Sequence, residues 1–204
     1  MYVGLPHKKK GTHISRFLEE LNQHASEPIS PEEIPALTQA IRDRLEAETA
    51  FFEATFTYFI RKPAPVTGQP GLMDYEVRFQ CTATGAGSDM VLAVKAPATS
   101  LCPCSKEISS YGAHNQRCHI EAAVRTKSML WIEDLAQMLE SAASCPVFAV
   151  LKRPDERWVT ERAYEQPKFV EDIIRDLAVT LEAEDRIVWY AISSENFESI
   201  HSHN

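Results

Sequence analysis

The sequence predicts an α+β fold in which antiparallel sheets carry helices on one face only. Three observations lead to this prediction. Several segments alternate apolar and polar residues as half-buried strands do, whereas others place their apolar residues on one helical stripe. The order of segments is also similar in the two halves of the chain, with strands, two helices and strands again. The polar strand faces need either solvent or the lumen of a larger assembly, so we expect a water-filled barrel built by several subunits.

The first half of the chain is expected to hold helices over residues 15–23 and 29–48. The second helix has a strong start, with Ser30 as its cap, Pro31 in the first turn and Glu33 completing a capping box. Alternating side chains then predict strands. The predicted strands of this half cover residues 1–6, 50–60 and 74–82.

The second half repeats the pattern. Apolar stripes predict helices over residues 131–143 and 168–183. The charged stretch 152–167 has no convincing period, so we expect an exposed connection there. The predicted strands of this half cover residues 89–96, 117–126, 186–193 and 197–203.

Composition limits the classes of function. The chain has 204 residues, a net charge of −8 and a pI near 5.4, so a nucleic-acid partner is not expected. No apolar stretch approaches the roughly 18–20 residues that span a bilayer, and the start MYVGLPHKKK lacks the order of a secretory signal. An odd number of cysteines, five, further favours a reducing cytoplasm over a disulfide framework.

The stretch SLCPCSKEISSYGAHNQRCHI, residues 100–120, concentrates cysteine and histidine. Cys102 and Cys104 flank a proline, so the local backbone is expected to be extended or turning. His114 follows beyond a turn, which lets thiolate and imidazole converge from two sides of a loop, as in many zinc sites. Spacing alone leaves open a metal site, a disulfide or redox pair, and buried cysteines acting as small apolar residues. The remaining cysteines are expected to be ordinary buried thiols; they are Cys81, Cys118 and Cys145.

Other side chains could complete such a site. The charged stretch offers four carboxylates as third ligands, namely Asp155, Glu156, Glu161 and Glu165. Glu171 lies in the first turn of a predicted helix, where the helix dipole alone favours a carboxylate. His201 and His203 are two residues apart in a predicted strand, so both would lie on one face and could transfer protons.

A second polar segment lies near the N-terminus. Gly11 and Thr12 precede a predicted helix, and helix starts present free amides to anions. Lys10 and Arg16 add positive charge beside them. A phosphate could bind here, although nothing matches a Walker-type loop.

Five stretches together resemble the type IB GTP cyclohydrolases of bacterial folate synthesis. They are SLCPCSKEISSYGAHNQR, GTHISRF, RPDER, VTERAYEQPKFVED and ENFESIHSHN. The resemblance runs over the whole chain, and the segment from Cys-Pro-Cys to His-Asn-Gln is specific to that family. It implies the hydrolysis of GTP to 7,8-dihydroneopterin triphosphate and formate.

The resemblance also implies a fold and an assembly. The family uses the tunnelling fold, with two tandem units of two strands, two helices and two strands, and forms homotetramers with barrels. We therefore expect an N-terminal unit over residues 1–84 and a C-terminal unit over residues 85–204 that carries most of the metal and purine site. Relatives carry a longer segment before GTHISRF, so the first unit is expected to lack its opening strand and the chain to be trimmed at both ends.

By the same resemblance, Cys102, His114 and Glu156 match the ligands of one divalent metal, zinc or manganese. Cys104 matches a reactive thiol beside the metal, and Glu171 matches the carboxylate that anchors guanine. His201 and His203 match histidines that we expect to transfer protons. The triphosphate is expected to contact Lys10, His13 and Arg16.

Two alternatives to this function were weighed. A nitrile reductase of the same fold would use a cysteine nucleophile with NADPH, and it would need a Cys–Asp arrangement and no metal. A metal-binding or thiol-sensing protein would instead cycle Cys102 and Cys104 through a disulfide, without turnover of GTP. The resemblance favours the cyclohydrolase, with a linear rather than a cyclic triphosphate product.

Overall fold

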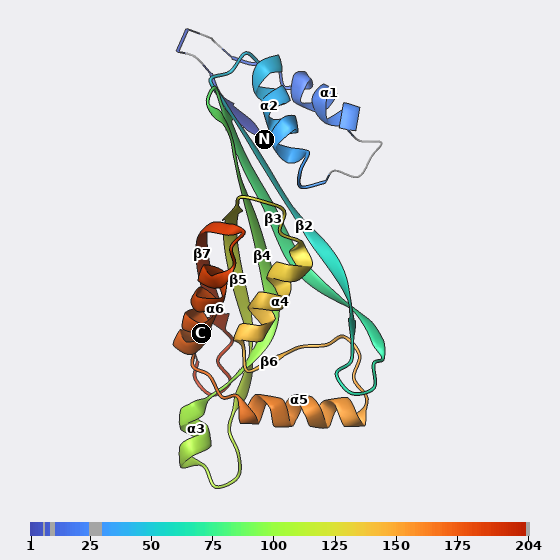
Figure 1. The fold of residues 1–204 in the computed structure, drawn as a ribbon, viewed down its shortest axis with the longest axis vertical. Helices are drawn as coiled ribbons and strands as arrows, with labels where there is room; N and C mark the ends of the chain where they lie inside the picture. Colours follow the sequence, from blue (N-terminus) through green and yellow to red (C-terminus); the bar gives the residue numbers. More distant parts are fainter. Residues whose placement is uncertain (6, 9–10, 25–29, 203–204) are drawn as a thin grey trace. The chain divides into compact units, whose positions relative to one another are not determined.

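The computed structural model describes residues 1–5, 7–8, 11–24 and 30–202 (Figure 1). The helices within these residues are α1 (Ser15–His24), α2 (Ile34–Arg44), α3 (Pro103–Ile108), α4 (Ile132–Ala142), α5 (Arg153–Glu165) and α6 (Val170–Ala183). The strands are β1 (Tyr2–Gly4), β2 (Thr49–Pro63), β3 (Pro70–Thr84), β4 (Gly87–Leu101), β5 (Asn115–Thr126), β6 (Cys145–Pro146) and β7 (Ile187–Asn196).

All of these strands belong to one sheet, in the order β1-β2-β3-β4-β5-β7, with β6 paired to β4. The α+β class agrees with the prediction. The tunnelling fold with two tandem units, assembling into barrels, was a wrong prediction, because the strands of both halves join in a single seven-stranded sheet. Residue alternation identifies the buried face of a strand but not its neighbour, so a similar order of segments did not reveal the pairing.

The chain divides into two compact units built from interleaved segments. Unit 1 comprises residues 1–55 and 78–92, and unit 2 comprises residues 56–77 and 93–204. The boundary predicted between residues 84 and 85 stays a prediction.

In unit 1, α1 packs against α2. The buried side chains of α2 and its end are Ile34, Leu37, Thr38, Ile41 and Leu45, which confirms the predicted apolar stripe. The predicted cap was wrong, because α2 begins at Ile34 with Glu33 as its N-cap. The Ser30 backbone N–H still donates to the Glu33 carboxylate at 2.7 Å.

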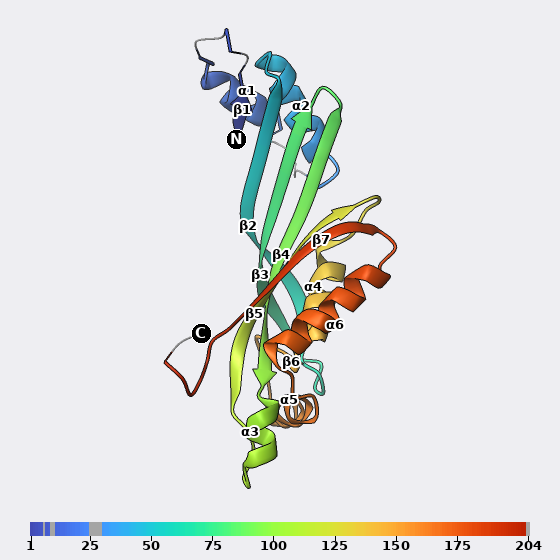
Figure 2. The same cartoon turned by 90° about the vertical axis from the view of Figure 1, so that its left-hand side faces the viewer.

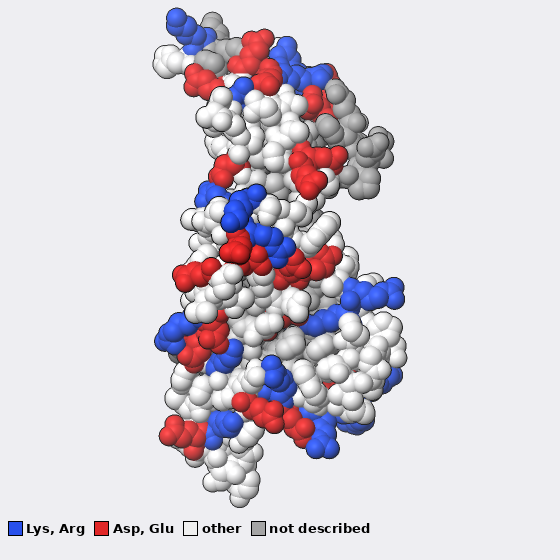
Figure 3. Space-filling model, in the orientation of Figure 1, with Lys and Arg blue, Asp and Glu red and all other residues white. Residues whose placement is uncertain are grey.

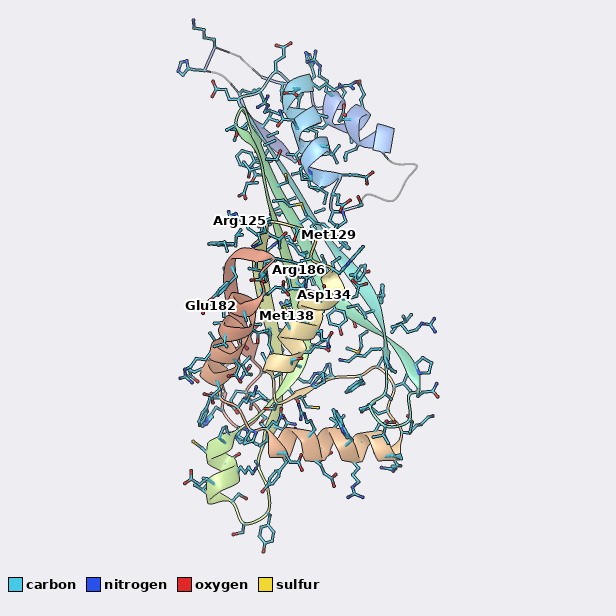
Figure 4. All side chains as sticks on the ribbon, viewed as in Figure 1. Arg125, Met129, Asp134, Met138, Glu182 and Arg186 are labelled. Atoms are coloured by element: carbon cyan, nitrogen blue, oxygen red, sulfur yellow. The ribbon has the colours of Figure 1, made fainter. Side chains whose placement is uncertain are left out.

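In unit 2, α4 packs on β5 and α6, and α6 packs on β7 (Figure 2). The side chains between them are almost fully buried: Ile120, Val124, Leu135, Leu139, Ile173, Leu177 and Leu181. Both helices were predicted, and so was the buried face of β5. At the turn between α6 and β7, Arg186 donates to Asp134 of α4 at 2.9 Å and to both oxygens of Glu184 (Figure 4). This cluster fixes the turn to α4.

Two predicted segments at the C-terminal side of unit 2 were wrong. The stretch 152–167 is not an exposed connection, because it forms α5, and Asp155 in its first turn is fully buried. The Asp155 carboxylate accepts hydrogen bonds from Val66, Thr67 and Lys152, and these bonds lower the pKa of Asp155 despite its burial. Residues 197–202 form no strand, since the chain leaves β5 after the Phe197 N–H donates to the Arg117 carbonyl.

Charges of both signs are mixed on the face drawn in Figure 3. Neighbouring ion pairs along helices, such as Arg157–Glu161 in α5 and Arg175–Asp172 in α6, illustrate this mixing. Among the described residues, no helix has both the length and the apolar character that crossing a bilayer requires.

Candidate active site

A pocket of about 350 Å³ in unit 2 contains four of the described residues for which chemistry was predicted. Its wall comes from the end of β4, the start of β5, the start of α6 and the segment after β7. The lining residues are Ser100, Cys102, His114, Gln116, Lys168, Phe169, Val170, Glu171, Asn196, Glu198 and His201.

Cys102 and His114 meet because the chain between them leaves the sheet and returns. The Cys102 N–H donates to the His114 carbonyl at 3.1 Å, which closes the excursion at its base. Within it, Ser105 ties the two ends together, since its hydroxyl donates to the Cys102 carbonyl and accepts from the His114 N–H. Gly112 allows the return, because its φ of 135° is unfavourable for other residues.

The Cys102 side chain caps α3. Its backbone is extended, as predicted, and its sulfur accepts a hydrogen bond from the Ser105 N–H at 3.4 Å. Thiolate is the form of cysteine that binds metals. Cys104 lies inside the short helix, which corrects the expectation of a non-helical backbone there.

The His114 ring is held from the segment after β7. Its Nδ1 lies 3.1 Å from the Ser199 hydroxyl and 3.8 Å from Glu198 Oε1. When Nδ1–H is donated to Ser199, Nε2 keeps its lone pair, which is the arrangement of most metal-binding histidines. The backbone N–H of Ile200, together with that of Ser199, lowers the pKa of Glu198, so a carboxylate stays close to the imidazole at neutral pH.

The other wall of the pocket is the start of α6. The Ser100 hydroxyl donates to the Lys168 carbonyl at 2.9 Å, and the Lys168 N–H donates to the Leu101 carbonyl at 3.0 Å. These bonds dock the segment before α6 on the end of β4. Phe169 and Glu171 follow at once, and their exposed side chains line the pocket. The Lys168 ammonium binds Asp176 at 2.7 Å.

The structure therefore brings together four of the predicted site residues: Cys102, His114, Glu171 and His201. It does not place Cys104 or Glu156 among the residues that line the pocket. His13 and Arg16 belong to unit 1, so their predicted contact with a triphosphate stays a prediction. Lys10 and His203 lie outside the described residues.

The five cysteines are all free thiols and fall into two groups. Cys81, Cys118 and Cys145 are buried, as predicted, and burial raises the pKa of Cys118 to about 12 and that of Cys145 to about 11. Such thiols stay protonated at neutral pH. Cys102 is partly exposed and Cys104 is exposed, so metal or redox chemistry falls to these two.

The pocket fits a metal in part. Thiolate sulfur and imidazole nitrogen are donors that zinc prefers, and Cys102 and His114 supply one of each. The third expected ligand, Glu156, lies in α5, where its carboxylate accepts from Arg153 at 3.0 Å. Across the described part of the chain, no three His, Cys, Asp or Glu side chains are grouped as a metal site. A single chain in this conformation presents two of the three expected ligands.

Several lining residues were not predicted. Glu198 lies three residues before His201 in ENFESIHSHN, and that stretch was the available signal for it. Gln116 lies at the start of β5, two residues after His114, and carries no charge that would have marked it. Ser100 and Asn196 carry no such signal, because only strand pairing brings them to the pocket.

The fold and the pocket define a class, an α+β protein with a pocket that gathers thiol, imidazole and carboxylate side chains. The comparisons with known proteins agree. A family model described as type I GTP cyclohydrolase folE2 matches residues 1–204. The GTP cyclohydrolase FolE2 of Magnetococcus marinus is 54% identical over 206 residues, which cover 100% of this chain and 77% of the relative.

Two further relatives show the same likeness. GTP cyclohydrolase FolE2 of Aromatoleum aromaticum is 55% identical over 205 residues, covering 100% of this chain and 75% of the relative. GTP cyclohydrolase FolE2 2 of Dechloromonas aromatica is 53% identical over 204 residues, with the same coverage of both chains. The chain belongs to the type I GTP cyclohydrolase FolE2 family.

Proposed function

We propose that this protein is a type IB GTP cyclohydrolase that converts GTP and water to 7,8-dihydroneopterin triphosphate and formate, the first step of tetrahydrofolate synthesis. Membership of the family supports the reaction. The observation that carries the proposal is the pocket, in which a thiol, two imidazoles and a free carboxylate face one volume of about 350 Å³. A pocket of this size suits a purine and its ribose.

Glu171 is proposed to anchor the guanine base. Its carboxylate lines the pocket, and within the described residues it makes no hydrogen bond or ion pair. A carboxylate can accept from the ring N1–H and the exocyclic amine of guanine together, and adenine has no such pair of donors. Phe169, two residues earlier and exposed toward the same pocket, supplies an aromatic face for the base.

Cys102 and His114 are proposed to hold one divalent metal, with Glu156 as the third ligand. A bound zinc or manganese ion would lower the pKa of water and so supply hydroxide for attack on C8 of the purine. A thiolate ligand favours zinc over manganese. Ser199 and Glu198 orient the His114 ring for this role from the other side.

The remaining steps need proton transfers at the opened purine ring. His201 lines the pocket, and we propose that it and His203 carry these protons, since imidazole titrates near neutral pH. Cys104 is proposed to act next to the metal. Lys10, His13 and Arg16 are proposed to bind the triphosphate, which leaves as a linear chain on the product.

We also infer a homo-oligomer, with the tetramer of the family as the expected state. Two features support it. The excursion between Cys102 and His114 carries Ile108 and Tyr111, large apolar side chains with exposed fractions of 85% and 101%. The pocket of one chain also lacks Glu156, which an adjoining copy could supply.

The reaction is tested by incubating metal-reconstituted protein with GTP. We expect release of formate and a product that oxidises to a fluorescent pterin. Absence of both, with one metal bound per chain, would refute the cyclohydrolase function. A nitrile reductase is disfavoured because the described lining residues include no aspartate. A thiol sensor would turn over no GTP and would change its Cys102–Cys104 oxidation state.

A further inference from the structure

Two acceptor atoms in the wall of the pocket lack partners. Asn196 Oδ1 and Gln116 Oε1 each expose less than 1 Å² and, across the described chain, accept no hydrogen bond. Both residues line the pocket. A buried acceptor without a donor costs stability, so each such atom in a native protein calls for an explanation, and a bound molecule that donates to it is one.

The orientation of the Asn196 amide is fixed by its neighbours. The Ser100 hydroxyl gives its proton to the Lys168 carbonyl at 2.9 Å, so its oxygen can only accept from Asn196. Asn196 Nδ2 donates to that oxygen at 3.3 Å. Nδ2 therefore belongs on the Ser100 side, and Oδ1 is the atom left without a partner.

The same bonds locate Asn196 at the guanine end of the pocket. Ser100 and Lys168 connect it directly to the segment that carries Phe169 and Glu171. Gln116 lies in β5, two residues before the Cys118 that pairs with Asn196 and two residues after His114. Asn196 is thus the amide tied by these bonds to the segment of Phe169 and Glu171.

Guanine offers three hydrogens on this edge, the N1–H and two on the exocyclic amine. A carboxylate that accepts the N1–H and one amine hydrogen leaves the second amine hydrogen without an acceptor. We propose that Asn196 Oδ1 accepts this hydrogen and so makes Asn196 a specificity-determining residue for guanine, an inference that rests on the proposed function. The oxygen exposes less than 1 Å² in the structure, so this hydrogen bond requires the wall of the pocket to open when the base binds.

The test measures equilibrium binding of three nucleotides to the full chain treated with a chelator, so that no turnover occurs. The nucleotides are GTP, inosine triphosphate, which lacks the amine, and N2-methyl-GTP, which keeps one amine hydrogen. One neutral hydrogen bond corresponds to about tenfold in affinity. The wild type should therefore bind N2-methyl-GTP about tenfold more weakly than GTP, and inosine triphosphate more weakly still.

Asn196→Leu keeps the size of the side chain and removes the acceptor. It should weaken GTP binding about tenfold, leave inosine triphosphate binding within about twofold, and abolish the preference for GTP over N2-methyl-GTP. Gln116→Met is the matched control, since it removes the other unpartnered amide. It should leave both preferences intact.

Three outcomes would overturn the inference. Equal binding of GTP and N2-methyl-GTP by the wild type would show that the second amine hydrogen is free, even if Asn196→Leu fails to fold. An equal loss for all nucleotides in Asn196→Leu, or a lost preference in Gln116→Met alone, would also contradict it. If the wild-type protein still releases formate from GTP in any of these cases, the proposed function stands and only the role of Asn196 is refuted. If the wild-type protein neither binds GTP nor turns it over, the proposed function and the role of Asn196 are both refuted.

Discussion

Replacing Tyr75 by phenylalanine should destabilise the protein through one buried hydrogen bond. Tyr75 in β3 has an exposed fraction of 2%, and its hydroxyl donates to Glu140 Oε1 of α4 at 2.6 Å. The same oxygen accepts from the Lys62 ammonium at 2.6 Å, and Lys62 also donates to the Val147 carbonyl. Burial and the Glu140 carboxylate raise the pKa of Tyr75, so its hydroxyl remains a donor at any physiological pH.

The size of the effect follows from the charge and burial of the acceptor. A hydrogen bond to a charged group contributes about 1.5–3 kcal/mol, and Phe keeps the ring packing of Tyr75. Lys62 still neutralises Glu140 in the variant, so no buried charge is left unpaired. For a chain of this length about 1 kcal/mol corresponds to roughly 2–4 °C, which gives a fall in Tm of about 3–12 °C.

Tyr58 provides the matched control within the same unit. Its hydroxyl donates to Glu133 at 2.7 Å, but this pair lies at the surface, where water replaces the bond. Tyr58→Phe should therefore change the free energy of unfolding by about 0.5 kcal/mol or less. Thermal and urea unfolding followed by circular dichroism measures both variants. Equal losses for the two substitutions would refute the reasoning that burial decides the contribution.

Three further predictions follow from the pocket and from the α6–β7 turn. Cys102→Ala should lose both its bound metal, measured by mass spectrometry, and formate release. Cys104→Ala should keep its metal. Full metal content in Cys102→Ala would exclude Cys102 as a ligand. Glu171→Gln should retain the metal but bind GTP about tenfold or more weakly in calorimetry, because it loses a charged acceptor, and unchanged affinity would contradict the guanine assignment. The Arg186 guanidinium lowers the pKa of Glu184 from 4.5 to about 2, so stability from this pair is complete above pH 4.5 and falls as the pH drops toward 2. Arg186→Gln should flatten that acid dependence in unfolding measured against pH.

The helices with a wide apolar stripe could be predicted from the sequence. In α4 and α6 the inward positions carry large aliphatic side chains at helical spacing, and residues such as Leu135, Leu139 and Leu177 are fully buried. The face of β5 that holds Ile120 was equally clear, because its apolar side chains alternate without interruption. In these elements the local pattern and the tertiary packing agree.

Helix α5 could not be predicted, because distant residues stabilise it. Its apolar contacts are few: Trp158, Val159 and Ala163 pack near Leu101 and Cys145, which lie on other elements. The start of α5 depends on Asp155, whose carboxylate accepts from residues 88 and 89 positions earlier in the chain. The periodicity of the stretch 152–167 reflects neither contribution, and the sequence therefore predicted a charged loop there.

Some residues of the candidate site could also be predicted from the sequence, and others could not. The spacing of Cys102 and His114 allowed the two side chains to converge, although it left a metal site, a redox pair and buried thiols open. Glu171 was assigned from the family resemblance, because the helix dipole alone accounts for a carboxylate in a first turn. The acceptor residues Gln116 and Asn196 were missed, because uncharged amides in strands have no distinctive spacing. Their place in the pocket depends on the pairing of the strands, which the sequence does not show.

Strand register explains why residues so far apart meet in one pocket. Along β5 and β7 the pairing runs without interruption from Cys118 opposite Asn196 to Arg125 opposite Trp189, and the irregularity follows only after Arg125. The end of the ladder next to the pocket is therefore regular, and the side chain of Asn196 lies on the same face of the sheet as that of the buried Cys118. A shift of one residue would turn Asn196 to the opposite face and bring Glu195 in its place. The regular register thus places the neutral amide of Asn196, rather than the carboxylate of Glu195, in the lining of the pocket.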